Sequence, residues 1–502
     1  MGVLLETRRE ATTKTHWVVV VLLAQMAFAL VTAAVQQTPT IDEPVYVGAA
    51  VVQLEQHSLR YNPEHPPLGK LIMATGLAFA DVHLDPSFAG DQTELGRHVL
   101  YESGNDPARL LLLARLPMIV LTLLFGLVVF LFARDLAGPV AGLVALALYA
   151  FSPDVIAHGS LATLDVPAAG FLLTSVWLLW RARSSVSYLP LAGLALGAAV
   201  ATKMSALAAV PVALLLVALS VQRSRAKAAA IVGLTAIIVV WASYVVVQPL
   251  AFPSLYLHGM GMQFGMENRV WGGFLFGTHY EGSRWYYLPA ALLVKTPLGA
   301  LVLWLAGAVV LVRRMRAAAL YVLAPTAVLL VTAMMGNRDL GVRYAIFVPM
   351  FLAVAAGCLV VVRRRWAHVV VAVLVAFVAV SSLRTFPYYL PYSNEAFGGP
   401  ARTHQHLHDS NVDWGQDLGR LADRLRERHP GERIWLVYKG AGVPEYYGIK
   451  AADPRVVPPG DVRGLLVVSD TAIAKADDRL AALLASSTPI DEVGHSITIF
   501  RR

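Results

Sequence analysis

The chain has 502 residues, of which 57% are hydrophobic and only 15% are charged, with a formal net charge of +8 at pH 7. This charged fraction lies well below the roughly 25% of a soluble domain, which excludes an ordinary cytosolic enzyme and indicates a polytopic membrane protein. The basic residues occur in short clusters between apolar segments, which argues against nucleic-acid binding, and the single cysteine, Cys358, excludes a disulfide framework and a cysteine-based metal site.

Apolar segments account for most of the first 383 residues. A membrane-spanning helix needs roughly 20 apolar residues, so the third to sixth segments are short and could tilt, pair or re-enter. The first segment has no small-residue cleavage motif behind it and is expected to be a retained span. The predicted spans number about eleven and lie at about 17–35, 110–133, 138–152, 166–180, 187–202, 204–221, 228–250, 286–311, 318–335, 343–361 and 366–383.

The positions of the basic clusters predict the orientation of these spans, because cytoplasmic loops carry an excess of Lys and Arg. With about eleven spans and a cytoplasmic N-terminus, every cluster falls on the cytoplasmic side of a plasma-membrane protein. The clusters are Arg8, Arg9 and Lys14; Arg134; Arg181 and Arg183; Arg223, Arg225 and Lys227; Arg313, Arg314 and Arg316; and Arg363, Arg364 and Arg365.

The large loops then lie outside the cytoplasm. The first, at about 36–109, is acidic, and within it residues 71–80 are too few to span and are expected to lie in the membrane interface. A second outer loop, at about 251–285, is rich in glycine and aromatic residues.

The pattern changes after residue 383. The segments 433–438, 464–470 and 496–500 are predicted strands, and the stretches around 415–429 and 476–486 are predicted helices. We therefore expect a helical membrane domain over 1–383 and a small extracytoplasmic α/β domain over 384–502.

Two acidic positions stand at the outer edge of predicted spans. Asp42 and Glu43 follow the first span directly; they are either a solvated turn that caps a helix starting at Pro44, or carboxylates placed to act as general base on an incoming hydroxyl. Asp165, two residues before Pro167, is a good helix N-terminus signal, and this capping role is compatible with a role in catalysis.

Several cations occur near the same edge. Lys203, Lys295 and Arg343 stand beside apolar segments, and Arg115 lies a little inside the second span, where an unpaired charge is expensive. A lysine in such a place often only extends to the headgroups. Taken together, however, these cations fit a phosphate group held at the interface.

Two patterns resemble metal sites. His404, His406 and His408 alternate, although a solvated surface explains them better, and 409–413 resembles the start of a calcium loop. Trp414 and Arg420 stand where that loop needs glycine and glutamate, which rules it out. Two or three carboxylates near the outer edge are able to hold a divalent ion, so the sequence leaves a metal requirement open.

Seven segments in order resemble the protein O-mannosyltransferase-like glycosyltransferases of the GT-C fold, which take their sugar from a phospholipid carrier. The segments are Asp42-Glu43-Pro44, HPPLGK (65–70), SPDVIAHGSLATLDVP (152–167), the Lys203 segment, YYLPAALLVKTP (286–297), GVRY (341–344) and DSNVDWGQDL (409–418). The eukaryotic members carry a soluble MIR domain to which nothing here corresponds, and the DSNVDWGQDL segment looks like that of bacterial members.

This resemblance implies a function. The enzyme would move mannose or another hexose or pentose from a polyprenyl-phosphate carrier to a protein, lipid or glycan hydroxyl, with inversion. Asp42 would be the base, Glu43 its neighbour in acceptor binding, and Asp165 a second acid. Lys203 and Arg343 would hold the donor phosphate, and the matching motifs and the second span place four more residues at the substrate: His65, Lys70, Arg115 and Tyr344.

Two other functions compete with this one. A secondary transporter usually places ionisable groups near the bilayer midplane, whereas here the predicted mid-span positions lack carboxylates and the acids gather in outer loops. A non-catalytic scaffold that binds a partner through 384–502 is the second alternative.

Overall fold

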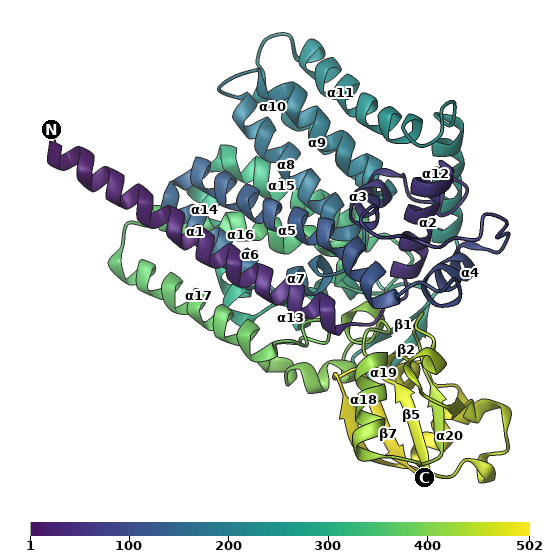
Figure 1. Cartoon of the computed structure of the whole chain (residues 1–502). Helices are drawn as coiled ribbons and strands as arrows, with labels where there is room; N and C mark the ends of the chain where they lie inside the picture. Colours follow the sequence, from purple (N-terminus) through teal and green to yellow (C-terminus); the bar gives the residue numbers. More distant parts are fainter. Residues whose placement is uncertain (1) are drawn as a thin grey trace.

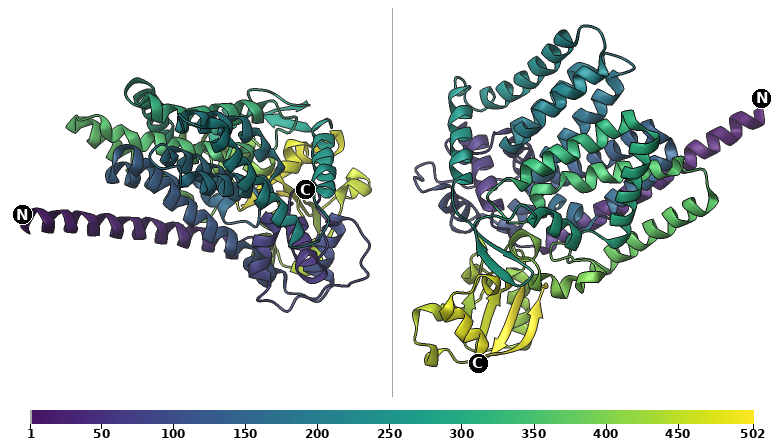
Figure 2. Two further views of the ribbon diagram at one scale, coloured as in Figure 1. Left: turned by 90° about the horizontal axis from the view of Figure 1, so that it is seen from above. Right: turned by 180° about the vertical axis from the view of Figure 1, so that it is seen from behind.

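The computed structural model describes residues 2–502, with side chains from Lys14 onward. Arg8 and Arg9, which were predicted to precede the first span, therefore lie outside the described side chains. Figures 1 and 2 show a large helical region with a small sheet domain, drawn in yellow, packed at one end of it. The long α1 extends away from the helical region toward the N-terminus.

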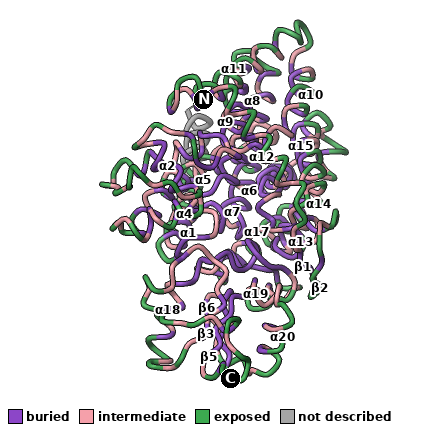
Figure 3. Tube along the Cα trace, turned by 90° about the vertical axis from the view of Figure 1, so that its right-hand side faces the viewer, coloured by how far each residue is buried: buried purple, intermediate pink, exposed green. Residues whose placement is uncertain are grey.

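The helical region is built from apolar helices that share one buried interior (Figure 3). Its helices are α1 (Gly2–Gln36), α5 (Pro107–Ala137), α6 (Pro139–Ala150), α7 (Pro153–Gly159), α8 (Asp165–Ala182), α9 (Tyr188–Thr202), η2 (Met204–Ala209), α10 (Val210–Ser220), α11 (Arg225–Val245), α13 (Tyr287–Lys295), α14 (Leu298–Arg314), α15 (Arg316–Met334), η3 (Val342–Ala345), α16 (Phe347–Gly357), η4 (Cys358–Val361) and α17 (Arg365–Thr385).

Five of the described helices are long and apolar enough to cross a membrane, and the number rises to seven if each of two bent pairs is one span. Helical elements occupy all eleven predicted ranges, but one bend lies within a predicted range and another directly follows one. The segment 286–311 is bent by 119° between α13 and α14, and α6 is bent by 63° from α7. Pro297 and Pro153 stand at these breaks, where a proline removes a helical hydrogen bond and blocks the preceding turn.

The two predicted outer loops are largely ordered. The first loop folds into α2 (Glu43–Gln56), α3 (Leu68–Leu77), α4 (Gln92–Arg97) and η1 (His98–Glu102), and the second into α12 (Ser254–Glu267) and the hairpin of β1 (Gly272–Leu275) and β2 (Thr278–Glu281). The helix α3 corresponds to the predicted interfacial segment. The first loop has its own buried cluster, which includes Val47, Val51, Met73 and Leu110.

The C-terminal part forms a five-stranded sheet of order β4-β3-β5-β7-β6. Strands β3 and β5 run parallel, and β7 is antiparallel to both β5 and β6. The elements are α18 (Leu418–Arg428), β3 (Ile434–Val437), β4 (Ala451–Ala452), β5 (Leu465–Ser469), α19 (Asp470–Ala474), α20 (Asp478–Ala485), β6 (Thr488–Val493) and β7 (Ile497–Arg501), joined through the short turns η5 (Glu395–Phe397), η6 (Pro400–Gln405), η7 (Asp409–Asn411), η8 (Pro444–Tyr447), η9 (Pro454–Val456) and η10 (Pro459–Asp461).

Alternation along β5 explains why the sheet is covered on both faces. Leu465 and Val467 share a buried cluster with α18, whereas Leu466 and Val468 share one with α20. Successive side chains of a strand point to opposite faces, so an uninterrupted apolar strand needs a helix on each side. The three predicted strands and two predicted helices are present. The exposed edge strand β6, which carries Pro489 and two acidic residues, was missed because it lacks this apolar pattern.

Candidate active site

The start of α2 sends two adjacent carboxylates in different directions. Asp42 is the residue before the helix, but its side chain makes no capping hydrogen bond. It instead accepts a hydrogen bond from Arg343 Nη1 at 2.5 Å, across 301 residues of sequence. A quarter of the Asp42 side chain is exposed, so this carboxylate is paired and still accessible.

Glu43 is completely buried and is held by a network of its own. Its two oxygens accept hydrogen bonds from Arg115 Nε at 2.7 Å and Arg115 Nη2 at 2.6 Å, a bidentate pair. It also accepts from Thr40 N, Thr40 Oγ1 and Ala162 N. Burial raises the pKa of Glu43, but the charge and hydrogen bonds of Arg115, together with the backbone hydrogen bonds from Thr40 and Ala162, hold that pKa below its usual range.

Arg115 has further partners behind this pair. Its guanidinium donates to the carbonyl oxygens of Ala34, Gln37 and Thr38. The buried charge within α5 is therefore neutralised by one carboxylate and surrounded by carbonyls at the end of α1 and just beyond it. This network fixes the segment that runs from α1 to Asp42.

Asp165 begins α8, as its position before a proline predicted, but the carboxylate turns toward two cations. It accepts a hydrogen bond from Lys203 Nζ and lies 3.9 Å from Arg343 Nη1. Lys203 has an extended backbone conformation and separates α9 from η2. Two helix ends thus bring an acid and a cation to one point.

Three cations surround the ring of Tyr344. Lys203 Nζ lies 5.2 Å from the ring centroid, and the guanidinium carbons of Arg343 and Arg338 lie 5.0 and 5.9 Å from it. Arg338 also pairs with Glu267 at the end of α12. Arg343 Nε is buried and has no hydrogen-bond partner among the described residues.

Two residues of the HPPLGK motif matter for the same site: His65 lines it, and Lys70 stabilises the loop that carries His65. His65 lies beside Tyr46, with their ring centroids 6.0 Å apart. Burial lowers the pKa of His65 well below its usual value, and the nearby Lys203 and Lys70 lower it further. Lys70 is itself buried and donates to His65 O and Asn62 O, both at 2.7 Å. Its ammonium group therefore stabilises the loop of residues 62–65 and does not line the cavity.

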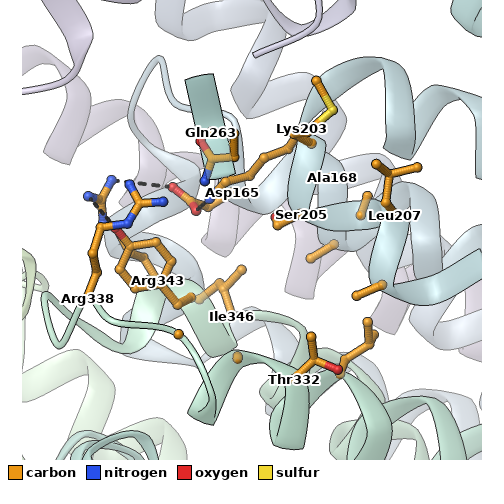
Figure 4. A pocket seen from close by; sticks show the side chains of 18 of the residues that line it. Asp165, Ala168, Lys203, Ser205, Leu207, Gln263, Thr332, Arg338, Arg343 and Ile346 are labelled. Carbon is orange, nitrogen blue, oxygen red and sulfur yellow. Dashed lines mark hydrogen bonds and ion pairs between the residues drawn. The ribbon is translucent and has the colours of Figure 1, made fainter. Parts of the chain in front are cut away.

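These groups line a cavity of about 680 Å³. Figure 4 shows Asp165, Arg338 and Arg343 on one side of it, and Ala168, Leu207 and Thr332 on the other. The apolar wall is made by α8, η2, α15 and the start of α16, whose lining residues include Leu172, Ala206, Leu329 and Phe347. The cavity therefore joins a charged end to an apolar end.

The structure brings together six of the nine residues predicted from the sequence. The cavity is lined by Asp42, His65, Asp165, Lys203, Arg343 and Tyr344. The remaining three, Glu43, Lys70 and Arg115, are buried behind its wall. Lys295 is also outside the cavity, where it lies 3.4 Å from Asp154 in a buried ion pair.

Seven polar residues of the lining were not predicted from the sequence: Tyr46, Ser205, Gln263, Glu267, Thr332, Asn337 and Arg338. A signal existed for Tyr46, because residues four apart share one face of a helix and α2 starts next to Asp42. Arg338 lies five residues before Arg343 in the same motif-bearing segment. Nothing local marks Gln263 and Glu267, which reach the cavity because α12 packs across its mouth.

Among the side chains that the structure describes, no group of three or more His, Cys, Asp or Glu residues is arranged to hold a metal ion. The alternating histidines differ from the expected solvated surface: His404 and His406 are only partly exposed. His408 is fully buried, and His406 packs against Phe276 and Phe397.

Comparison with known proteins places this site in context. Residues 19–255 match the model of a family described as dolichyl-phosphate-mannose-protein mannosyltransferase (PMT). The matched region contains Asp42, His65, Asp165 and Lys203, whereas Arg343 lies beyond it. None of the curated proteins matches the chain significantly.

Solved structures match over almost the whole chain. ArnT from Cupriavidus metallidurans bound to undecaprenyl phosphate is 13% identical, with a TM-score of 0.53 and coverage of 97% of this chain and 98% of that one. The same protein in the apo state matches with 16% identity, the same TM-score and the same coverage. The Saccharomyces cerevisiae Pmt1–Pmt2 complex bound to its sugar donor covers 53% of this chain and 39% of that one, at 16% identity and a TM-score of 0.33.

The fold is that of the GT-C membrane glycosyltransferases, as the sequence predicted, and the chain is a multi-pass membrane enzyme of this class. Within the class, residues 19–255 carry the region that characterises the PMT family. The predicted fold class and the predicted resemblance are both confirmed.

Proposed function

We propose that this glycosyltransferase moves a sugar from a polyprenyl-phosphate carrier to an acceptor hydroxyl on the extracytoplasmic side of the plasma membrane. The observation that carries the proposal is a single cavity with three cations and an accessible carboxylate at one end and an apolar wall at the other. A polyprenyl-phosphate sugar has the matching form: an isoprenoid chain, a phosphate and a sugar.

The cations have capacity left for the phosphate. Lys203 Nζ uses one of its three donors on Asp165, and Arg343 lines the cavity beside it. A phosphate oxygen forms its strongest hydrogen bonds with such charged donors. Arg338, which the sequence analysis overlooked, adds a third cation to this phosphate site.

Asp42 is the proposed general base. It takes the proton of the acceptor hydroxyl while that oxygen attacks the anomeric carbon from the face opposite the phosphate. The bond between the anomeric carbon and the phosphate oxygen breaks, and the electron pair leaves with the polyprenyl phosphate. Lys203 and Arg343 stabilise the charge that develops on the leaving phosphate. The anomeric configuration is inverted.

Asp165 is proposed to be the second acid of the site. Its carboxylate forms ion pairs with Lys203 and with Arg343, which also pairs with Asp42. Both cations therefore keep a fixed position when no donor is bound. His65 and Tyr344 line the space between the charges and are proposed to contact the sugar and its phosphate. Glu43, Arg115 and Lys70 are proposed to hold the two loops that carry Asp42 and His65.

The orientation and the domain division are part of the proposal. The N-terminus is cytoplasmic, the loop with Asp42 and the C-terminal part are extracytoplasmic, and the division lies near residue 383. The large cavity-bearing helical part and the sheet domain are joined at one end of the helical region, which is consistent with a single outer face (Figure 2).

A transfer assay tests the proposal. The purified enzyme in lipid nanodiscs is given polyprenyl-phosphate-linked radiolabelled mannose, and in parallel other hexoses and pentoses on the same carrier. Label entering protein, lipid or glycan acceptors is then measured. We expect transfer from at least one donor and a decrease in kcat of about 10²–10⁴-fold for Asp42→Asn, the range for loss of a positioned base. An Asp42→Asn variant with near-normal kcat would show that another group is the base.

The Arg97→Met variant serves as the control for this assay. Arg97 pairs with Glu102 on the exposed surface of the same outer loop. Its substitution changes a charge on this loop without touching the cavity, so it should transfer sugar at the wild-type rate.

A further inference from the structure

The loop of residues 409–418 leaves the C-terminal part of the chain and packs behind the wall of the active site. Ser410, Asn411 and Trp414 are all buried within it. The loop contacts the segment before Asp42 on one side and the segment before Arg343 on the other. It is therefore the element that joins the two halves of the Asp42–Arg343 pair.

On the Asp42 side, two of the contacts are hydrogen bonds between backbone groups. Ile41 N donates to Trp414 O at 2.9 Å, and Thr38 N donates to Gln416 O at 3.0 Å. The Thr38 hydroxyl bridges the same loop, because it donates to Gly415 O at 3.1 Å and accepts from Leu418 N at 3.2 Å. The residue immediately before Asp42 is thus fixed by Trp414.

On the Arg343 side, the contacts come from side chains. Ser410 Oγ donates to Leu340 O at 2.7 Å, and Val342 N donates to Asn411 Oδ1 at 3.0 Å. The approach is close, because a Cβ built on Gly341 would collide with Ser410 Oγ. The guanidinium carbon of Arg343 lies 4.4 Å from the ring centroid of Trp414.

Further hydrogen bonds fix the loop on the side that faces away from Asp42 and Arg343. Asn411 Nδ2 donates to Tyr287 OH at 2.9 Å, and Asn411 O accepts from Lys295 Nζ at 2.9 Å. Asp413 accepts hydrogen bonds from Gly415 N at 3.1 Å and Thr471 N at 3.2 Å. The loop therefore has a fixed conformation against which Arg343 can be oriented.

We propose that Trp414 and Asn411 are positioning residues of the transferase site, through which the C-terminal part of the chain aligns Arg343 with Asp42. This inference rests on the proposed function and gives the C-terminal part a role in the reaction itself. Trp414 presents its ring to the face of the guanidinium, and Asn411 fixes the backbone one residue before Arg343. Neither side chain lines the cavity.

The test compares two tryptophans of the same part of the chain. Trp414 and Trp435 are each 1% exposed, and each has an arginine guanidinium 4.4 Å from its ring centroid. The arginine of Trp435 is Arg433, which is not in the cavity lining. Both Trp→Leu variants should lose comparable thermal stability, but only Trp414→Leu should lose kcat/KM, by about twofold to thirtyfold, the range for one cation–π contact.

Two further variants separate positioning from general destabilisation. Trp414→Phe retains an aromatic face and should recover most of the lost activity. In combination with Arg343→Met, which removes the cation, Trp414→Leu should add almost nothing to the loss caused by Arg343→Met alone, because residues that act through one contact are non-additive. Additive losses would overturn the proposal, because they indicate that Trp414 acts independently of Arg343.

If Trp414→Leu does not fold, Thr38→Val provides a second test of whether the loop positions the Asp42 segment. This substitution preserves side-chain shape and removes only the hydroxyl that bridges the loop to the Asp42 segment. We expect a lower kcat with little change in the KM for the donor, and a wild-type kcat would overturn the proposal. A wild-type enzyme that transfers no sugar from any polyprenyl-phosphate donor refutes the proposed function instead, and this outcome is seen before any variant is made.

Discussion

Replacing Arg115 with methionine should destabilise the protein strongly, because the change leaves the Glu43 carboxylate buried without its counter-ion. The two side chains are 1% and 0% exposed, so water cannot replace the lost partner. Breaking a buried pair by removing one member costs about 3–5 kcal/mol. Counting bonds gives a similar figure, since two charge-assisted hydrogen bonds to Glu43 are lost at roughly 1.5–3 kcal/mol each.

The double variant Glu43→Gln/Arg115→Met tests the cause of this loss. The glutamine side chain would be neutral, and its single amide oxygen could keep either the hydrogen bonds from Thr40 or the one from Ala162 N. The double variant should therefore be more stable than Arg115→Met alone. The carbonyl oxygens of Ala34, Gln37 and Thr38 would still lack their donor, so wild-type stability should not return fully.

The assay is the free energy of unfolding in mixed micelles, measured by denaturing-detergent titration and followed by tryptophan fluorescence. Arg97→Met is again the control, because its pair with Glu102 has both side chains about half exposed and is expected to contribute at most about 1 kcal/mol. If Arg115→Met costs no more than Arg97→Met, the buried network does not stabilise the Asp42 segment as we argue.

Three shorter predictions concern the cavity and the 409–418 loop. Lys203→Met should raise the KM for a polyprenyl-phosphate donor by about tenfold or more, as expected for one charged hydrogen bond of 1.5–3 kcal/mol, and an unchanged KM would place the phosphate elsewhere. Ala168→Trp should fill the apolar end of the cavity and impair long-chain donors more than short-chain analogues in competition assays; equal impairment would contradict an isoprenoid site there. Burial, together with the nearby Asp470, raises the pKa of Asp413 to about 8. Its folded state therefore holds a proton that the unfolded state releases near pH 4, so stability should fall by up to about 1.4 kcal/mol per pH unit between those values. Asp413→Asn should remove this slope in unfolding measurements at several pH values, and parallel slopes would contradict it.

The sequence located most of the site because four of its charged residues stand at the ends of apolar helices. Asp42 and Lys203 lie at breaks between helices, Asp165 begins one, and Arg343 lies just before another. Alternation of the spans predicts that such ends share one side of the membrane. It does not predict which ends meet, and the Asp42–Arg343 contact across 301 residues depends on packing alone.

The roles of neighbouring residues were harder to separate. Asp42 and Glu43 are chemically similar in sequence, but consecutive positions in a helix differ by about 100° in direction. This rotation turns Glu43 toward Arg115 and leaves Asp42 in the cavity. The bends at Pro153 and Pro297 were also not predicted. An apolar segment identifies a membrane helix by its composition, whereas a change in the direction of the helix is indicated only by the proline.

The pairing of Thr38 with Gly415 also has a consequence for biosynthesis. The two residues are separated by 377 positions, so ribosomes must make most of the protein before Thr38 finds its partner. In the proposed orientation, a nascent chain that has inserted its early helices would already place Asp42 at the bilayer surface, within reach of a lipid-borne donor. Without the late segment it would lack the contacts of the 409–418 loop with the Asp42 and Arg343 segments. If these two residues act as proposed, it should remain inactive until synthesis is nearly finished.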